Sequence, residues 1–480
     1  MNEFCTVLPE ATLTALACFV LVLDVMRGAR GSALTFWAAA LTLIVVLGEI
    51  TLGFMRTTAT VTVFHGSFRL DVMATVLKAF LLVNVLLAFF YARDYFERHG
   101  RVQSEFFLLA LFATIGMMVL ISAHSLLTVY LGLELLSLSL YAMVAMDRDA
   151  AAACEAAMKY FVLGALASGM LLYGMSMLYG VAGTLDLGEL SQRVSGGGQH
   201  LLFTFGLVFV IIGVAFKLGV VPFHMWVPDV YQGAQTPVTL FIASAPKLAA
   251  FAMAVRLLTD GLAGLAAEWQ TMLVLLAIAS MALGNLVAIA QTNIKRMLAY
   301  STISHMGFLL LGLLAANTSG YAAAMFYVIV YAIMSMGAFG AIILLSSATT
   351  ESEQLQDFAG LAKRSPWLAF IMLILMFSLA GMPPFAGFWA KWFVLKEVVA
   401  AGYPWLAGVA VLFSLIGAYY YLRVIKLMYF DEPAGGVEII TASDDVRLVF
   451  SVNGLSVLLL GILPGTLMSV CVTAMLAYSL

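Results

Sequence analysis

Long apolar runs, separated by short polar stretches, follow one another along almost the whole chain. A helix needs about 20 apolar residues to cross the hydrocarbon core of a bilayer, and the runs have about this length. Their spacing predicts about fourteen membrane-spanning helices, so that both termini lie on one side, with breaks in the seventh and the twelfth. The predicted spans are residues 9–26, 33–54, 71–92, 104–122, 125–146, 157–181, 201–231, 236–258, 270–290, 296–315, 321–346, 366–400, 404–430 and 448–476.

The composition agrees with this pattern, because 63% of the residues are hydrophobic and only 10% are charged. Soluble domains carry about 25% charged residues, so we predict an all-α polytopic membrane protein. The formal net charge of −3 offers no basic surface for nucleic acid. The chain has no P-loop and no GxGxxG motif, and Cys5, Cys18, Cys154 and Cys471 lack metal-ligand spacing. We therefore expect no nucleotide, iron–sulfur cluster or disulfide in this chain.

The basic residues predict how the chain is oriented. Glu3 and Glu10 precede the first span and Arg27 follows it, which is the reverse of a signal peptide. Loops on the side of Arg27 hold most of the basic residues and are predicted to be cytoplasmic, so both termini are predicted to lie outside. The predicted cytoplasmic side carries Arg27, Arg30, Arg93, Arg98, Arg101, Arg148, Lys159, Lys295, Arg296, Lys363, Arg364, Arg423, Lys426 and Arg447, and the opposite side carries Arg56, Arg69, Arg193 and Arg256.

Two lysines lie within the apolar stretch 203–251, Lys217 late in one run and Lys247 in the middle of the next. An ammonium at a helix centre costs roughly 2.5 to 3.5 kcal/mol on insertion scales, so such residues mostly face a protein interior or a water path. Gly219 and Pro222 interrupt the helix directly after Lys217 and free backbone groups that lipid cannot satisfy. A buried lysine beside a broken helix predicts an ion or proton site at membrane depth.

The two predicted breaks share a sequence pattern. Residues 219–223 and 381–385 both read G-x-x-P-F, and a tryptophan follows each, Trp226 and Trp389. Paired interruptions in corresponding spans are typical of transporters that are built from two structural repeats. We therefore predict one membrane domain, 1–480, that contains three amino-terminal helices (1–103), a first five-helix repeat (104–258), a second (270–430) and a last helix (448–476). Two loop segments, 186–200 and 353–365, are predicted to be amphipathic surface helices.

Glu134 lies in the middle of the fifth predicted span, far in sequence from any other charge. The second and fourth helices of a five-helix unit can face each other, so Lys217 is its predicted partner. At an effective dielectric of about 20, a pair at about 4 Å gains roughly 4 kcal/mol. Movement of Glu134 relative to Lys217 would therefore change the proton affinity of the lysine enough to load and release a proton. The alternative is a static ion pair that fixes helix packing.

The other candidates for proton transfer are basic side chains near the breaks or in the middle of spans. They are Lys247, Lys391, His224 and His305. A histidine titrates near neutral pH and can pass protons between buried lysines, although a lone histidine is often only a packing residue. Structural roles are the leading interpretation for Lys78 and Lys396, because Lys78 could pair with Asp71 or snorkel and Lys396 lies beside Glu397. The roles of Asp24 and Glu49 stay open.

These segments resemble a known family. They are LGLELLSLSLYAMVA with Glu134, AFKLGVVPFHMWVPDVYQGAQTPV with Lys217, ASAPKLAAF with Lys247, QTNIKRMLAYSTISHMGF, and SLAGMPPFAGFWAKWFVL with Lys391. The chain resembles, over nearly its whole length, the antiporter-like membrane subunits of respiratory complex I, the bacterial NADH-quinone oxidoreductase. The resemblance implies two inverted five-helix repeats with broken helices seven and twelve, and a polar axis through Glu134, Lys217, Lys247 and Lys391.

The resemblance also implies what this chain does and what it leaves to others. Flavin, iron–sulfur clusters and the quinone site would belong to partner subunits, and electron transfer from NADH to quinone would drive proton translocation here. The expected partners are neighbouring antiporter-like and small membrane subunits, in a bacterial inner membrane. Two alternatives remain open at this point: a subunit of a multisubunit cation/proton antiporter, which would not copurify with flavin and iron–sulfur subunits, and a membrane scaffold that does not conduct protons.

Overall fold

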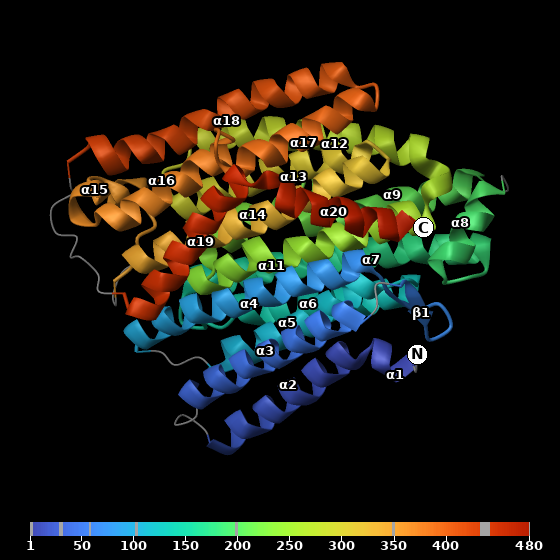
Figure 1. The fold of residues 1–480 in the computed structure, drawn as a ribbon, viewed down its shortest axis with the longest axis horizontal. Coiled ribbons are helices and arrows are strands. Elements are labelled where there is room, and N and C mark those ends of the chain that lie inside the picture. Colours follow the sequence, from blue (N-terminus) through green and yellow to red (C-terminus); the bar gives the residue numbers. More distant parts are fainter. Residues whose placement is uncertain are drawn as a thin grey trace.

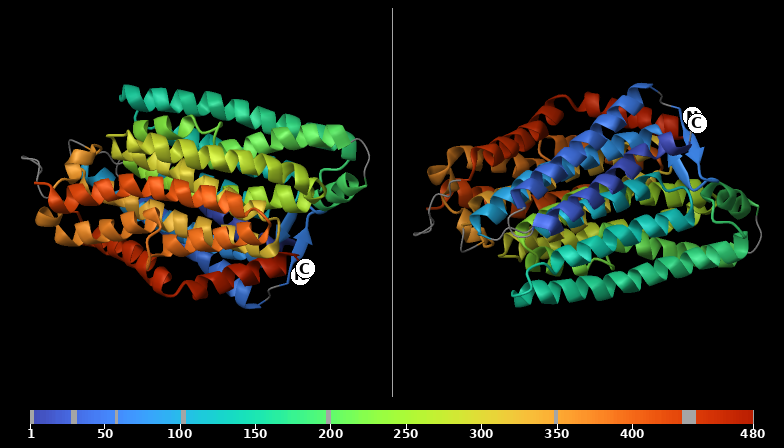
Figure 2. Two further views of the ribbon diagram at one scale, coloured as in Figure 1. Left: turned by 90° about the horizontal axis from the view of Figure 1, so that it is seen from above. Right: turned by 90° about the horizontal axis from the view of Figure 1, so that it is seen from below.

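The computed structural model describes residues 3–27, 32–56, 59–100, 104–196, 200–347, 351–432 and 442–479. Almost all of them form long helices that run roughly along one direction, side by side (Figure 1). The two further views show the same elongated arrangement (Figure 2). In the described residues, thirteen helices are long and apolar enough to cross a membrane. The predicted span 366–400 is divided into two shorter helices, α16 (Pro366–Ala380) and α17 (Ala386–Ala400). The prediction of an all-α polytopic membrane protein is confirmed.

The helices follow the predicted spans closely. In chain order they are α1 (Glu3–Thr6), α2 (Leu8–Arg27), α3 (Ser32–Arg56), α4 (Val72–Arg98), α5 (Ser104–Ser122), α6 (Leu126–Val144), α7 (Ala151–Ala182), α8 (Leu187–Ser195), α9 (His200–Leu218), α10 (Trp226–Gly233), α11 (Thr236–Val255), the π-helix η2 (Arg256–Gly261), the 3₁₀ helix η3 (Ala263–Leu265), α12 (Ala266–Ile289), α13 (Ile294–Leu314), α14 (Thr318–Leu345), the 3₁₀ helix η4 (Leu355–Phe358), α15 (Leu361–Arg364), α16 (Pro366–Ala380), α17 (Ala386–Ala400), α18 (Pro404–Phe430), α19 (Asp444–Ile462) and α20 (Pro464–Ser479).

Three local features differ from the sequence-based expectations. The last predicted span, 448–476, is two helices that meet at a bend visible in red in Figure 2, because Pro464 cannot continue the hydrogen bonding of α19. The loop before α4 contains a hairpin of β1 (Val61–Val63) and β2 (Phe68–Leu70), whose strands are too short to read from periodicity. Segment 353–365 forms only η4 and the four-residue helix α15.

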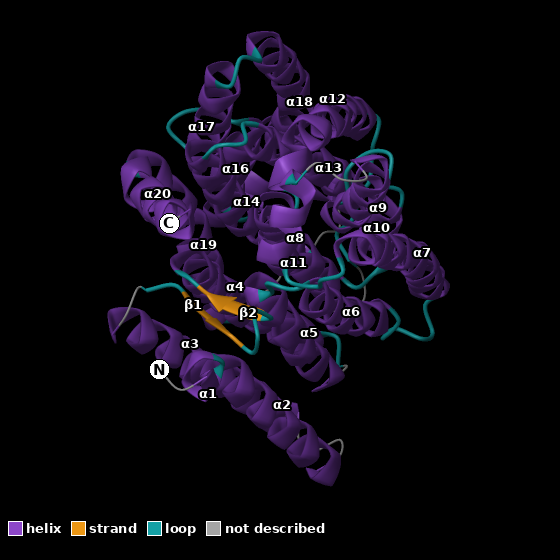
Figure 3. Ribbon diagram, turned by 90° about the vertical axis from the view of Figure 1, so that its right-hand side faces the viewer, coloured by secondary structure: helices purple, strands orange, loops and turns teal. Residues whose placement is uncertain are grey.

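The two ends of the bundle differ. Figure 3 shows the end of the bundle that carries the hairpin, α8, the beginning of α1 and the end of α20. Both ends of the described chain therefore lie at the same end of the bundle. The opposite end carries α15 and the first turn of α13, which begins beside Lys295 (Figure 1). We call these the hairpin end and the Lys295 end. The hairpin end carries Arg69, Arg193 and Arg256, which the sequence analysis assigned to the outer side.

We call the helices from α5 to α11 the first unit and those from α12 to α18 the second unit. In the first unit, the backbone before α6 pairs with the segment before α8 through Leu126 N to Leu185 O (2.9 Å) and Leu187 N to His124 O (3.1 Å). In the second, Ile294 N bonds Glu353 O (2.7 Å) and Leu355 N bonds Thr292 O (2.9 Å). The same pairing therefore recurs in each unit at equivalent positions.

A close helix crossing also recurs. A Cβ on Gly116 of α5 would lie 2.6 Å from the backbone nitrogen of Leu136 in α6, and a Cβ on Gly284 of α12 would lie 2.8 Å from that of Ser304 in α13. Only glycine permits this approach, because any side chain would collide with backbone atoms that cannot move aside. The second helix of each unit is thus held against the first at a fixed height, which positions its polar side chains.

Candidate functional site

The first break begins where α9 ends. Gly219 has a positive φ of 81°, and the amides of Gly219 and Val220 turn back to the carbonyls of Phe216 and Ala215 at 3.0 Å each. This is a Schellman cap, and glycine is favoured in it because other residues are strained at positive φ. The cap leaves the carbonyl of Leu218 free to accept a hydrogen bond inside the protein.

Lys217 lies in the last turn of α9 and is almost fully buried. Its ammonium donates to the hydroxyl of Ser137 in α6 at 3.0 Å. Both line a cavity of about 10 Å³, which is near the smallest volume that holds one water molecule. The lysine therefore meets a neutral oxygen and a water-sized space.

Glu134 lies one turn before Ser137 on α6, and its carboxylate accepts a hydrogen bond from Ser168 of α7. Ser168 also lines the cavity beside Lys217. Within the described residues, Glu134 and Lys217 form no direct ion pair, and the hydroxyls of Ser137 and Ser168 lie at the cavity between them. The structure thus brings the predicted partners into one site but leaves them separated.

Lys247 lies in the middle of α11, a helix that is buried along its length, and only 1% of its surface is exposed. Its ammonium donates to the carbonyl of Leu218 at 3.0 Å, which is the free carbonyl at the end of α9. It also lies 5.4 Å from the ring centroid of Trp226, a cation–π distance. Lys247 therefore occupies the negative end of the first half-helix, and among the described residues it contacts no carboxylate.

The second break has the same cap. Gly381 has a φ of 84°, and the amides of Gly381 and Met382 bond the carbonyls of Ser378 and Phe377 at 2.9 and 3.0 Å. Lys391, from α17 after the break, donates to the carbonyl of Ala380 at 2.9 Å and to Ser414 of α18 at 2.8 Å. A lysine ammonium thus again meets the last carbonyl of the half-helix, but it comes from a different element.

His305 of α13 is 4% exposed and shares hydrogen bonds with the hydroxyls of Tyr327 (2.7 Å) and Tyr421 (3.1 Å). It lines a second cavity of about 10 Å³ together with Lys391 and Ser414. His305 and Lys391 therefore share one site. His224 lies in the first break, half-buried, and among the described residues its Nδ1 has no hydrogen-bond partner and no contact joins it to a lysine. A role for His224 stays a prediction.

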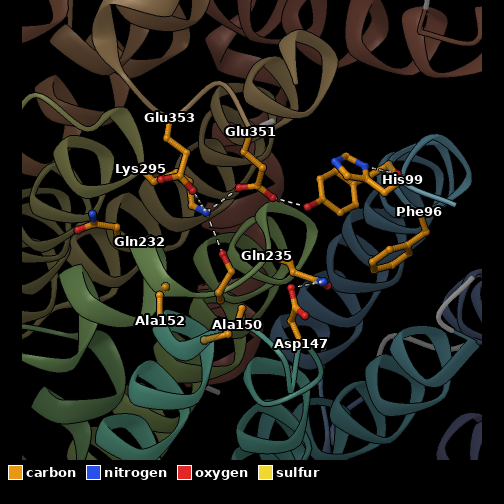
Figure 4. Close-up of a pocket in the computed structure, with 14 residues that line it drawn as sticks. Phe96, His99, Asp147, Ala150, Ala152, Gln232, Gln235, Lys295, Glu351 and Glu353 are labelled. Atoms are coloured by element: carbon orange, nitrogen blue, oxygen red, sulfur yellow. Dashed lines mark hydrogen bonds and ion pairs between the residues drawn. The ribbon is translucent and has the colours of Figure 1, made fainter. Parts of the chain in front are cut away.

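A further cluster, at the Lys295 end, was not recognised from the sequence, which only placed Lys295 on the predicted cytoplasmic side (Figure 4). Lys295 is 1% exposed and donates to Glu351 at 3.1 Å, to Glu353 at 2.9 Å and to the carbonyl of Ala234 at 2.8 Å. The cluster borders a cavity of about 460 Å³ into which Asp147 and Gln235 also point. Only the fold reveals it, because its carboxylates come from a loop distant in sequence.

The charge of Lys295 controls the neighbouring carboxylate. Burial of Glu351 opposes its ionisation, but the Lys295 ammonium and a hydrogen bond from Tyr95 outweigh this effect and lower the pKa of Glu351 to about 2. Glu351 is therefore ionised at neutral pH and keeps Lys295 paired. This lysine is held by two counter-ions, whereas the partners of Lys217, Lys247 and Lys391 in the described part of the chain are neutral oxygens.

The proposed pairing of Lys78 with Asp71 is wrong. Lys78 of α4 is buried and pairs with Glu10 of α2. Asp71 caps α4 and lies 2.6 Å from the fully buried Arg256 of η2, at the hairpin end. Lys396 lies 3.7 Å from Glu397 and is mostly exposed, as expected for a structural residue.

Asp24 and Glu49, whose roles the sequence left open, accept hydrogen bonds from hydroxyl groups. Glu49 accepts a hydrogen bond from Thr12 at 3.1 Å, and Asp24 accepts from Thr35 and Ser104 at 2.6 and 2.9 Å. In the described residues, no group of three His, Cys, Asp or Glu side chains lies close enough to hold a metal ion.

Comparisons with known proteins show which family the chain resembles. The family model described as NADH:quinone oxidoreductase/Mrp antiporter, TM matches residues 123–417. The NADH-quinone oxidoreductase subunits N of Thiobacillus denitrificans and Nitrosomonas europaea are 56% and 54% identical to this chain. Each alignment covers 99% of this chain and 98% of the relative.

Solved structures share the fold. A chain of respiratory complex I from Thermus thermophilus with bound aureothin superposes with a TM-score of 0.82 at 33% identity, over 96% of this chain and 98% of that one. A chain of the Mrp complex from Dietzia sp. DQ12-45-1b has a TM-score of 0.81 at 21% identity, over 98% of this chain and 97% of that one. The first comparison extends to sequence, and the second shows a common fold alone.

Proposed function

The chain belongs to the antiporter-like membrane subunits of NADH-quinone oxidoreductase, in the subunit N family, and we propose that Lys217, Lys247 and Lys391 carry the protons that it translocates. It is a component of respiratory complex I and a multi-pass membrane protein. The alternative of a cation/proton antiporter subunit has less support: the description of the family model names both kinds of protein, but the identity to the Mrp chain is 21%, against 56% and 54% for the two subunits N.

The contacts of the three lysines carry this proposal. Each ammonium bonds hydroxyl or carbonyl oxygens, and none bonds a carboxylate in the described residues. An amine in contact with a carboxylate stays charged, as Lys295 does, because losing its proton would leave a buried anion unpaired. A lysine that meets only neutral oxygens leaves no such anion behind, so it can exchange its proton with a neighbouring water.

Glu134 would act as the switch. It lies near Lys217 without contacting it, so a small shift of α6 or α7 would change the field at the ammonium. Electron transfer from NADH to quinone in the partner subunits would drive that shift. Each proton moved against 100 mV requires about 2.3 kcal/mol, which is less than the roughly 4 kcal/mol that a contact pair can gain.

The same proposal includes the direction of proton transfer, the orientation of the chain and its division into repeats. Protons would enter at the Lys295 end, from the cytoplasm, and leave at the hairpin end, so both termini would lie outside. The chain would be organised as residues 1–103, 104–258, 270–430 and 448–476, with His305 as a relay beside Lys391. Neighbouring antiporter-like and small membrane subunits would cover its flanks, and His224 would be a further relay at the first break.

The proposal is tested with NADH-driven proton uptake in inverted membrane vesicles, scaled to quinone-reductase turnover. Lys217→Met should lower the uptake sharply while the complex remains assembled, because the first unit loses its proton carrier. Lys396→Met is the matched control, since that lysine is exposed and should pump as wild type. If Lys217→Met pumps normally, the lysine is structural and a non-conducting scaffold is the better description.

A further inference from the structure

The second break is packed against an element outside its own unit, the bend between α19 and α20 (red in Figure 2). Gly461, the residue before the last of α19, lies directly on the backbone of the break. A Cβ on Gly461 would collide with the carbonyl oxygen of Pro384 and would lie 2.7 Å from the backbone nitrogen of Ala386. Only glycine therefore lets the end of α19 approach the break this closely.

A hydrogen bond joins the same two elements. Trp389 of α17 donates its indole N–H to the carbonyl of Gly461 at 2.8 Å. The carbonyls in the last turn of a helix have no partner inside that helix, and Pro464 prevents α19 from continuing. The indole supplies a donor for one of these carbonyls, so this hydrogen bond caps α19 and links it to the half-helix that follows the break.

The position of that half-helix decides where the ammonium of Lys391 lies. Lys391 follows Trp389 by two residues on α17 and donates across the break to the carbonyl of Ala380. The start of α17 is tied to α16 by a hydrogen bond from the amide of Gly387 to the hydroxyl of Ser378 at 3.0 Å. The bend holds α17 from the other side. A shift of the bend would therefore move the ammonium relative to its carbonyl.

The bend is itself held in place by the far end of α20. The hydroxyl of Tyr478 donates to Asp260 and shares a hydrogen bond of 2.8 Å with the hydroxyl of Thr259. Arg69 of the hairpin donates to the carbonyl of Tyr478 at 2.9 Å. Asp260 and Thr259 belong to η2, which directly follows the helix that carries Lys247. The last helix therefore runs from a fixed point at the hairpin end to the second break.

The first break uses its tryptophan differently. Trp226 donates its indole N–H to the carbonyl of Phe216 at 2.9 Å, and Phe216 belongs to α9, the half-helix before that same break. Trp389 instead reaches out of its unit to α19. The contact with Gly461 is therefore a feature of the second lysine site and not a general feature of the repeated G-x-x-P-F pattern.

We infer that Trp389 and Gly461 are positioning residues for Lys391: they fix the second break against the bend of the last span, so that the ammonium meets the carbonyl of Ala380. The inference rests on the proposed function, because the position of Lys391 matters for pumping only if this lysine carries a proton. Neither Trp389 nor Gly461 takes up a proton. They act through the place at which Lys391 binds its own.

The first test removes the hydrogen bond and keeps the ring. Trp389→Phe should lower scaled proton uptake in vesicles about fivefold, as expected when one neutral hydrogen bond is lost. Trp367→Phe is the matched control, because Trp367 also donates its indole N–H to α19, to Ser451 at 2.7 Å, but from the opposite end of α16. This control should pump as wild type.

The second test changes the close approach. Gly461→Ala places a methyl group against the backbone of the break and should lower uptake at least as strongly as Trp389→Phe. Gly465→Ala is the matched control, because Gly465 lies in the same bend and a Cβ there would meet no atom of the described residues within 4 Å. If Gly461→Ala does not assemble into the complex, Trp389→Phe alone decides.

The pH dependence of uptake distinguishes positioning from a general loss of packing. An ammonium that is held less well by its carbonyl keeps its proton less tightly, so the loss in Trp389→Phe should grow as the pH rises. The other titratable groups at the same cavity, His305, Tyr420 and Tyr421, are unchanged in this variant. A loss by the same factor at every pH would assign Trp389 to packing only and would overturn the inference.

Comparison with Lys391→Met separates this inference from the proposed function. If Lys391→Met is impaired while Trp389→Phe and Gly461→Ala pump like their controls, the positioning role is refuted and the lysine proposal stands. If Lys391→Met itself pumps normally, this lysine carries no proton, and the inference fails together with that part of the proposed function.

Discussion

The two broken helices end in the same way but recruit their lysines differently. Both use a glycine cap, and in both an ammonium donates to the carbonyl directly before that glycine, Leu218 or Ala380. In the first unit the ammonium belongs to Lys247 on α11, which follows the half-helix α10, and in the second to Lys391 on α17, the half-helix after the break. The fold thus specifies where a positive charge is needed, and the sequence can supply it from more than one element.

The units differ more strongly in what surrounds the lysines. In the first unit, Glu134 and Ser137 lie on α6. In the second unit, His305 lies on α13, as many residues after the N-cap of that helix as Ser137 lies after the N-cap of α6. Apart from Lys391, the groups that line the second site are uncharged polar or apolar side chains together with this histidine. We therefore propose that the first unit controls its lysine by a carboxylate, and that the second conducts through a neutral network.

The largest effect is expected from removing the carboxylate of the first unit. Glu134→Gln keeps the shape and can still accept a hydrogen bond from Ser168, but it removes the field that would change the affinity of Lys217 for its proton. Scaled proton uptake in vesicles should fall at least about tenfold, since this corresponds to only about 1.4 kcal/mol. Glu397→Gln, at the exposed Lys396, is the control and should leave uptake unchanged. Normal pumping by Glu134→Gln would mean that no carboxylate controls the lysine of the first unit, so that the two units do not differ in this control.

A smaller effect distinguishes the two lysine sites by their hydrogen bonds. Ser137→Ala removes the one hydrogen bond that Lys217 makes in the described residues, whereas Ser414→Ala leaves Lys391 bonded to Ala380. A hydrogen bond to a charged group contributes about 1.5 to 3 kcal/mol, so Ser137→Ala should impair uptake more than Ser414→Ala. The measurement is the ratio of uptake rates in vesicles with equal amounts of assembled complex. An equal loss of proton uptake in both variants would contradict the idea that Lys217 depends more strongly on its serine than Lys391 does.

The smallest effect concerns stability rather than pumping. Glu351 has its pKa lowered to about 2, so its ionised form stabilises the fold at pH values above the unfolded pKa near 4.5. That contribution should decrease as the pH falls from about 4.5 towards 2. Glu351→Gln should therefore lower the unfolding temperature of the purified protein at pH 7 and flatten its dependence on acidic pH. Glu432→Gln, at an exposed pair with Lys363, should change neither.

The sequence predicted the parts of the fold that depend on local pattern. Residues 104–122 and 404–430 were predicted with the bounds that the structure shows, because apolar length and flanking polar residues define a span. The breaks were also predictable, since Gly219 and Pro222 impose their own backbone geometry. The bend at Pro464 carried the same signal, but one proline within a long apolar run does not distinguish a kinked helix from two helices.

Pairings between distant residues could not be predicted in the same way. Lys78 pairs with Glu10, and Lys295 with Glu351 and Glu353, because packing of separate helices and loops brings them together. That Glu134 lies near Lys217 was predicted only from the order of the spans. This order could not show that two serines lie at the cavity between them. Side-chain partners depend on the rotation of each helix, which a largely uniform apolar sequence leaves undetermined.

The size of the two small cavities beside Lys217 and Lys391 has a consequence for ion selectivity. Each of them, at about 10 Å³, has room for about one water molecule. A sodium ion would have to give up its hydration shell there and find replacement oxygens, as ions do in the filters of channels. A proton needs neither, because it moves by exchange of bonds while every oxygen stays in place. We therefore expect these cavities to exclude metal cations by their size, without any residue dedicated to recognising them.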